Sequence, residues 1–119
     1  MAKIDKLSFG SIVIDGKKYS RDVLLFANGM VKKRKGGFLM FGSHGIKKEE
    51  IEELAEDSPE AVIIGTGTSG KATVAPEVEG WAKEKNLSLM VQPSHKAAAE
   101  LNKLTEQKRK VAALIHITC

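Results

Sequence analysis

The sequence contains little of several residue types that would identify particular classes of protein. Its 119 residues include one cysteine, Cys119, so no disulfide can form within the chain, and disulfide-stapled secreted scaffolds are excluded. Aromatic residues make up only 5% of the chain, which argues against a base-stacking surface for single-stranded nucleic acids. No apolar run approaches the ~20 residues of a membrane-spanning helix. We therefore expect a cytoplasmic protein with no membrane partner.

What is present is typical of a globular domain. Apolar residues account for 42% of the chain and charged residues for 29%, and the length is close to the commonest domain size. We expect a single domain over residues 1–119 that folds without a cofactor. The first ten residues mix charged with apolar side chains, so we expect no signal peptide.

The net charge of +4 is distributed unevenly along the chain. Residues 1–48 contain 11 lysines and arginines against 3 aspartates, whereas residues 49–119 contain 8 basic against 12 acidic residues. A basic half of this kind can face a polyanion or an acidic partner. The densest run, Lys32–Lys35, supports nucleic-acid binding only as the weakest of three functional hypotheses, because a solvated hairpin face explains it more simply.

The N-terminal half has the patterns of β-strands. Ser11–Ser20 predicts a hairpin, since Asp15 and Gly16 tolerate the positive φ angles of a type I′ turn. Val23–Phe26 predicts a strand that prolongs this hairpin. A short amphipathic helix is predicted over Lys47–Glu56.

The C-terminal half alternates strands and helices. Apolar segments predict strands at Ala61–Ile64, Leu87–Gln92 and Val111–Ile117. Helices are predicted between them, over Pro76–Lys85 and from Ser94, as N-cap, to about residue 110. Short connections of this kind imply right-handed crossovers and parallel strands. The chain is therefore predicted to be an α/β domain whose sheet is at least partly parallel.

One segment has the form of a phosphate-binding loop. In residues 61–73, AVIIGTGTSGKAT, an apolar strand is followed by three glycines and a lysine. Gly65, Gly67 and Gly70 match the spacing G-x-G-x-x-G, while Gly65, Gly70 and Lys71 match G-x-x-x-x-G-K. Both spacings are typical of nucleotide-binding turns between a strand and a helix.

Each nucleotide hypothesis lacks a required residue. A triphosphate loop needs Ser or Thr directly after the lysine to hold Mg²⁺, where this chain has Ala72. Its helix should begin at the lysine, yet Pro76, the expected helix start, comes five residues later. A dinucleotide site needs an acidic residue at the end of the next strand, where Gln92 stands. These two hypotheses account least well for the loop.

Two simpler roles for the loop carry more weight. The first is a sharp turn of the backbone, and the second is an anion or small-ligand pocket without catalysis, because loops at the carboxyl ends of parallel strands border ligand crevices. The candidate ligand-binding residues are Gly65, Thr66, Gly67, Thr68, Ser69, Gly70 and Lys71.

No catalytic or metal-binding arrangement of side chains is evident in the sequence. The three histidines, His44, His95 and His116, are not in metal-ligand spacing with one another. His116 lies three residues before Cys119, but a strand would direct the two side chains to opposite faces. We interpret His116 as structural, assign no catalytic residue and no metal, and favour a non-enzymatic role.

The order of the motifs resembles a known family. The segment SHKAAAELNKLTEQKRKVAALIHITC, residues 94–119, is similar to the tail of the adipogenesis-associated Mth-type domain family, long labelled a domain of unknown function. Val62–Gly67 matches the strand and loop that precede this tail. FGSHGI, Phe41–Ile46, is similar to the family's histidine-bearing segment, and SFG, Ser8–Gly10, to its opening.

The resemblance implies a three-layer α/β fold with a mixed sheet and a β-hairpin packed to one side. Together with the strand–helix alternation, we expect a mostly parallel central sheet whose C-terminal half is βαβαβ. The family implies no established enzymatic activity. One branch resembles an assembly factor of mitochondrial respiratory complex I, and another is associated with fat-cell differentiation. His44, Asn102 and Arg109 match the family pattern and are candidate contact residues.

Three functional hypotheses follow from these observations. The leading one is a non-enzymatic binding or assembly module that docks a protein partner. The second is a protein or enzyme that binds an anionic metabolite through the loop at Gly65–Lys71. The third is nucleic-acid binding through the basic run. The oligomeric state, including a homo-oligomer, is left open.

Overall fold

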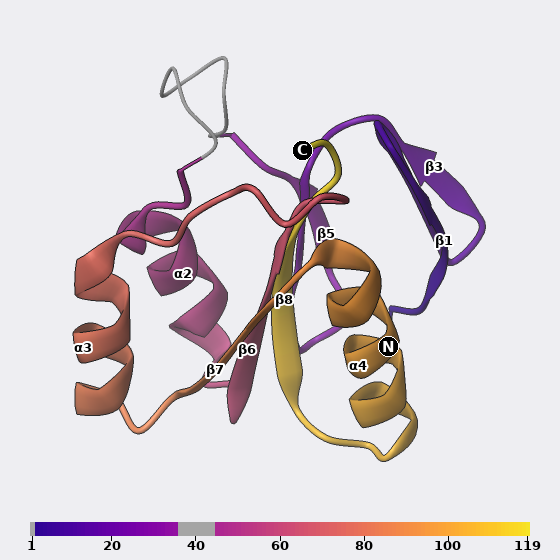
Figure 1. Cartoon of the computed structure of the whole chain (residues 1–119). Helices are drawn as coiled ribbons and strands as arrows, with labels where there is room; N and C mark the ends of the chain where they lie inside the picture. Colours follow the sequence, from indigo (N-terminus) through magenta and orange to yellow (C-terminus); the bar gives the residue numbers. More distant parts are fainter. Residues whose placement is uncertain (1, 36–44) are drawn as a thin grey trace.

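Two β-sheets and three α-helices form the part of the chain that the computed structural model describes, residues 2–35 and 45–119 (Figure 1). The smaller sheet is antiparallel, and its strands lie in the order β1 (Ile4–Ser8), β2 (Ser11–Ile14) and β3 (Lys17–Tyr19). The predicted hairpin is confirmed, since Asp15 has a φ of 50° and Gly16 a φ of 80° between β2 and β3. The expectation of a hairpin alone was wrong, because β1 adds a third strand beside β2.

The larger sheet is mixed and has five strands in the order β5-β4-β8-β6-β7. They are β4 (Val23–Leu25), β5 (Val31–Lys33), β6 (Ala61–Thr66), β7 (Ser88–Gln92) and β8 (Val111–His116). Only the pairs β8–β6 and β6–β7 are parallel, whereas β5–β4 and β4–β8 are antiparallel. The expectation of a mostly parallel sheet was therefore wrong, because the N-terminal half contributes two antiparallel strands.

Strand β4 does not prolong the hairpin, as its sequence pattern had predicted. All three of its residues are buried, so it needs neighbours on both of its faces. The larger sheet supplies this environment, because Val23 and Leu25 pack into the core on one of its faces and Leu24 packs into the core on the other. Strand β4 lies inside that sheet, paired with β8 along one edge and with β5 along the other. A strand of the exposed hairpin would have left one face in water.

The helices cover the larger sheet on both faces (Figure 1). They are α2 (Lys48–Leu54), α3 (Pro76–Glu84) and α4 (Ser94–Glu106). On one face, α2 and α3 pack against one set of alternate strand residues, including Val62 and Ile64. On the other face, α4 and the smaller sheet pack against the alternate set, including Ile63. The predicted βαβαβ order of the C-terminal half is confirmed, and it brings the carboxyl ends of β6, β7 and β8 to one end of the sheet.

Two predicted helix boundaries needed correction. Helix α4 ends at Glu106 instead of near residue 110, because Lys108 adopts a left-handed φ of 60°. Ser94 is the first residue of α4 but does not cap it; Pro93 occupies the N-cap position. None of the helices within the described ranges is long and apolar enough to cross a bilayer.

Candidate functional site

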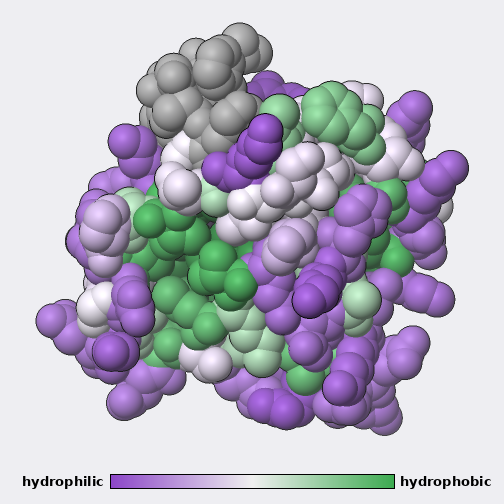
Figure 2. Space-filling model, in the orientation of Figure 1, coloured by the Kyte–Doolittle hydropathy of each residue, from purple (hydrophilic) through white to green (hydrophobic). Residues whose placement is uncertain are grey.

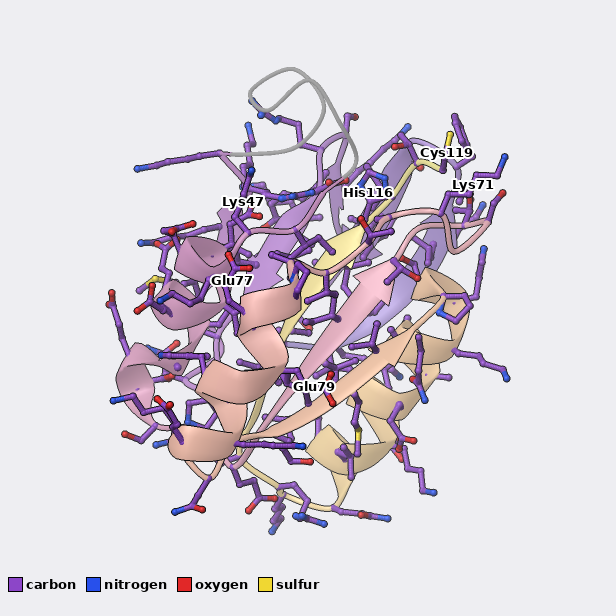
Figure 3. The ribbon with its side chains drawn as sticks, turned by 60° about the vertical axis from the view of Figure 1, so that its left-hand side comes forward. Lys47, Lys71, Glu77, Glu79, His116 and Cys119 are labelled. Carbon is purple, nitrogen blue, oxygen red and sulfur yellow. The ribbon has the colours of Figure 1, made fainter. Side chains whose placement is uncertain are left out.

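The glycine-rich loop leaves the end of β6 and lies against the last residues of the chain. Figure 3 shows Lys71, His116 and Cys119 together at the end of the sheet where β6 and β8 finish. The N–H of Thr68 donates to the carbonyl oxygen of Thr118 at 2.7 Å, and the N–H of Lys71 donates to the carbonyl oxygen of Cys119 at 2.9 Å. The Thr68 hydroxyl also reaches the Thr118 carbonyl, at 3.2 Å. The carbonyl oxygens of the segment after β8 therefore already accept hydrogen bonds from loop N–H groups that an anion would need.

Ser94 joins this loop to β8 from the start of α4. Its hydroxyl is fully buried, accepts the N–H of Gly67 at 2.8 Å and donates to the carbonyl oxygen of His116 at 2.5 Å. An added Cβ at Gly65 would lie 2.7 Å from this hydroxyl oxygen. Gly67 has a φ of +111°, and an added Cβ there would overlap the backbone of Cys119. The glycines are thus needed for close packing within the chain itself.

The remaining predicted loop residues divide between buried and exposed positions. The Thr66 side chain is 6% exposed and donates to the carbonyl oxygen of Gln92 at 3.1 Å. The N–H of Gly70 donates back to the carbonyl of Gly67 at 3.1 Å, which closes a tight turn. Ser69 and Lys71 are exposed. These contacts support the sharp-turn hypothesis, and ligand binding by the loop stays a prediction.

A buried charge cluster lies beside this end of the sheet, and the sequence did not reveal it. Arg34, from the basic run, is 1% exposed. Its Nε and Nη2 donate to the two carboxylate oxygens of Glu50 at 2.5 and 2.9 Å, and its Nη1 donates to Asp22 at 2.8 Å. Its Nη2 also donates to the carbonyl oxygen of Gly45 at 2.9 Å. The cluster thus ties the chain before β4 and after β5 to helix α2.

This pairing changes the interpretation of the basic run. Arg34 is enclosed by two carboxylates, and Lys32 forms an ion pair with Glu53 at 3.3 Å. The run is therefore not a continuous exposed strip of four cations, and the structure offers a polyanion less positive surface than the sequence indicates.

His116 extends the cluster through Asp22. The residue is 2% exposed, and its imidazole Nδ1 lies 2.6 Å from Asp22 Oδ2 and its Nε2 3.1 Å from the Thr118 hydroxyl. The N–H of Ile117 donates to Asp22 Oδ1 at 2.8 Å. A hydroxyl, an imidazole and a carboxylate in series are the parts from which histidine-activated nucleophiles are built. Here, however, the carboxylate also binds Arg34 and a backbone amide, so the series holds β4 against β8.

Hydrogen bonds and neighbouring charges keep Asp22 and Arg34 ionised. Burial acts to raise the pKa of Asp22, but the hydrogen bonds from His116 and the Ile117 amide, the charge of His116 and the hydrogen bond from Arg34 outweigh it and lower that pKa. Burial likewise acts to lower the pKa of Arg34, but Glu50 and Asp22 outweigh it and raise that pKa. Arg34 and Asp22 therefore remain a charged pair at neutral pH. Within the described residues, no three His, Cys, Asp or Glu side chains gather closely enough to hold a metal ion.

The three predicted contact residues are not brought together. Asn102, on α4, exchanges two hydrogen bonds with the backbone of Ile4, at 3.0 and 2.8 Å, and so fastens the smaller sheet to this helix. Arg109 pairs with Glu60 where β6 and β8 begin, at the opposite end of these strands from the loop. His44 lies outside the described residues.

A groove runs between α3 and the edge strand β7. It encloses about 350 Å³. Figure 2 shows apolar side chains gathered on the face where α3 and β7 lie in Figure 1. Its lining residues are Val74, Ala75, Pro76, Glu79, Leu89 and Val91. Val91 is 50% exposed, which makes it one of the few large apolar side chains open to solvent among the described residues.

Comparison with known proteins identifies the family. The family model described as "Protein of unknown function (DUF498/DUF598)" matches residues 4–116. The solved structure of MT938 is 30% identical, covers 100% of both chains and superimposes with a TM-score of 0.84. A conserved hypothetical protein from Pyrococcus horikoshii OT3 is 27% identical, with 98% of this chain and 99% of that chain covered and a TM-score of 0.82.

A more distant structure shares the fold alone. A Mth938-like domain from Bordetella pertussis is 15% identical, with 98% of this chain and 85% of that chain covered and a TM-score of 0.78. The family match, the identity to MT938 and this shared fold agree with the resemblance that residues 94–119 and Val62–Gly67 indicated. The chain belongs to the DUF498/DUF598 family of Mth938-like domains.

Proposed function

We propose that this protein is a non-enzymatic docking module whose edge strand β7 pairs with an extended segment of a partner protein. The observation that carries this proposal is the contrast between the two edges of the larger sheet. Strand β5 presents two exposed lysines, Lys32 and Lys33, and lysines on an edge discourage pairing with other chains. Strand β7, with the sequence SLMVQ, contains no charge and no proline. It pairs only with β6 among the described strands.

The groove beside β7 supplies specificity. A partner strand that hydrogen-bonds to an exposed edge places alternate side chains into neighbouring pockets. Leu89 and Val91 are two residues apart and therefore lie on the same face of β7, where they line the groove with Pro76. An apolar side chain of the partner would cover Val91, and complete burial of such a side chain contributes about 1.5–3 kcal/mol.

The charge of α3 favours a different protein over a second copy of this chain. Helix α3 carries three glutamates against one lysine. Antiparallel pairing of two β7 strands would continue the sheet across a two-fold axis, so the two α3 helices would lie side by side on the same face. Two acidic helices would repel each other there. A partner segment flanked by basic residues would be attracted instead.

The anionic-metabolite hypothesis receives less support. A metabolite at Gly65–Lys71 would have to compete with Thr118 and Cys119 for the loop amides. A thermal-shift panel of nucleotides and phosphorylated metabolites tests this alternative, since a ligand at 100 times its Kd adds about 2.7 kcal/mol of stability. We expect no shift from any of them.

Peptide selection tests the docking proposal directly. We expect 12-residue peptides selected on the folded chain to alternate apolar side chains and to slow amide exchange in β7. Val91→Lys should weaken their binding at least about tenfold, because it places a charge in the groove. Met30→Lys is the matched control, since Met30 is 51% exposed and lies far from β7 in the turn between β4 and β5.

Two results would contradict the proposal. Selected peptides that bind V91K and wild type equally would place docking elsewhere. A concentration-dependent dimer in sedimentation experiments that V91K abolishes would make a second copy the occupant of β7.

A further inference from the structure

A second cavity lies on the other side of α3, around the only tryptophan in the chain. It encloses about 430 Å³ between α2, the 3₁₀ turn η1 (Ala55–Asp57) that follows it, and α3. This volume is within the range of small-ligand sites. Its lining residues are Glu52, Ala55, Glu56, Ser58, Pro59, Trp81, Lys85 and Leu87. None of them lines the groove beside β7.

The polar groups of this cavity are mostly acidic. Glu52, on α2, and Glu56, in the η1 turn that follows it, both line the cavity. Both are exposed, and neither belongs to an ion pair within 4 Å among residues 2–35 and 45–119. Lys85, which is also exposed, is the only cation in the described lining. The described part of the cavity therefore carries more negative than positive charge.

The rest of the lining is aromatic and aliphatic. Trp81 is half-buried, so part of its indole remains open to the cavity. An indole face attracts cations, and more strongly when the site is partly desolvated. Ala55, Pro59 and Leu87 supply apolar surface for an aliphatic stem. The combination suits a delocalised cation on a hydrocarbon chain better than a divalent metal, which needs more oxygen ligands than two side chains provide.

We infer that this cavity binds an alkylguanidinium group. A guanidinium is planar, stacks on aromatic rings and forms paired hydrogen bonds to carboxylates, all of which this lining offers. The group would stack on Trp81 and donate to Glu52 and Glu56, with its stem against the apolar wall. An arginine side chain of a polypeptide and a free alkylguanidine share this chemistry. The inference does not depend on the docking role of β7.

The single tryptophan makes the test direct. We expect butylguanidinium to produce a saturable change in Trp81 fluorescence, and butylurea, a neutral molecule of the same shape, to produce none. The double variant Glu52→Gln/Glu56→Gln should lower the affinity at least about tenfold. Lys85→Gln should raise it, because it removes the competing cation.

A charge-matched control distinguishes binding of the guanidinium in the cavity from its attraction to the overall negative charge of this surface. Glu49→Gln/Glu77→Gln also removes two negative charges, from exposed residues outside the cavity, and should leave the affinity within about twofold of wild type. Repeating the titration with acetyl-Gly-Arg-Gly-amide distinguishes the sources: tighter binding than butylguanidinium supports an arginine in a partner chain, and weaker binding supports a free metabolite.

Three outcomes would overturn the inference. They are a response to butylurea equal to that of butylguanidinium, an equal loss of affinity in the two double variants, and no saturable change with either guanidinium probe. Circular dichroism of each variant confirms that it is folded, so a loss of binding reports on the cavity.

Discussion

Arg34 and Glu50 form a two-pronged ion pair in the interior of the protein, with Nε and Nη2 of the arginine 2.5 and 2.9 Å from the two oxygens of the glutamate. The same guanidinium binds Asp22 at 2.8 Å, and through Asp22 it is linked to His116. One side chain from the basic run therefore connects the residue before β4, helix α2 and the end of β8.

Removing Arg34 should destabilise the fold strongly. In Arg34→Ala the carboxylates of Asp22 and Glu50, whose side chains are 12% and 10% exposed, lose their shared partner. Breaking a buried ion pair by removing one partner costs about 3–5 kcal/mol. Urea unfolding measures this cost, and Lys33→Ala, an exposed position in the same run, should change stability by less than about 0.5 kcal/mol. Similar midpoints for the two variants would show that the cluster contributes little.

Asp22 should make the protein sensitive to acid. Its pKa in the folded state lies below the ordinary value of 3.8, so the unfolded chain takes up the proton first as the pH falls. Its contribution to stability is therefore complete above about pH 4 to 5 and is lost as the pH drops through the lower folded pKa. Unfolding free energies measured between pH 7 and pH 2 should fall less steeply in Asp22→Asn than in wild type. Parallel profiles would assign the acid sensitivity to other carboxylates.

Alanine substitutions should distinguish a glycine that is tightly packed, Gly67, from a glycine with open space around it, Gly80. Gly67→Ala combines a φ of +111° with overlap of the Cys119 backbone, so it should cost at least about 1–3 kcal/mol. Gly80→Ala is the control, because an added Cβ in that position of α3 meets nothing within 4 Å and alanine favours a helix by about 1 kcal/mol. Thermal unfolding should show a lower Tm for the first variant and a higher Tm for the second. A tolerated Gly67→Ala would mean that the loop moves away from the C-terminal segment readily.

Some local features were predictable because neighbouring residues decide them. Asp15 and Gly16 form the expected turn, since short-range backbone conformation favours positive φ there. Asn86 follows α3 with a left-handed φ of 55°, a conformation that asparagine adopts more readily than most residues and that ends helices. The alternation of apolar strands and amphipathic helices after Ala61 likewise predicted the βαβαβ order.

Signals for the charge cluster were present but ambiguous. An arginine stands within a lysine run, an aspartate precedes a fully apolar strand, and a histidine ends another. Each has a simpler interpretation when it is considered alone. Only their meeting in space, across 94 positions between Asp22 and His116, gives them a common role.

Local sequence was enough to specify most strands, helices and turns of this protein, because hydrophobic periodicity and backbone preferences act over a few residues. It also made a sharp turn at Gly65, Gly67 and Gly70 one of the two favoured hypotheses for the loop after β6. Which groups that loop binds depends on the folded chain, since Ser94 and Thr118 reach it from distant positions. The place of β4 between β5 and β8 in the larger sheet and the burial of Arg34 also depend on the folded chain. Long-range packing determines these features, because a buried charge or donor that is left unpaired costs free energy.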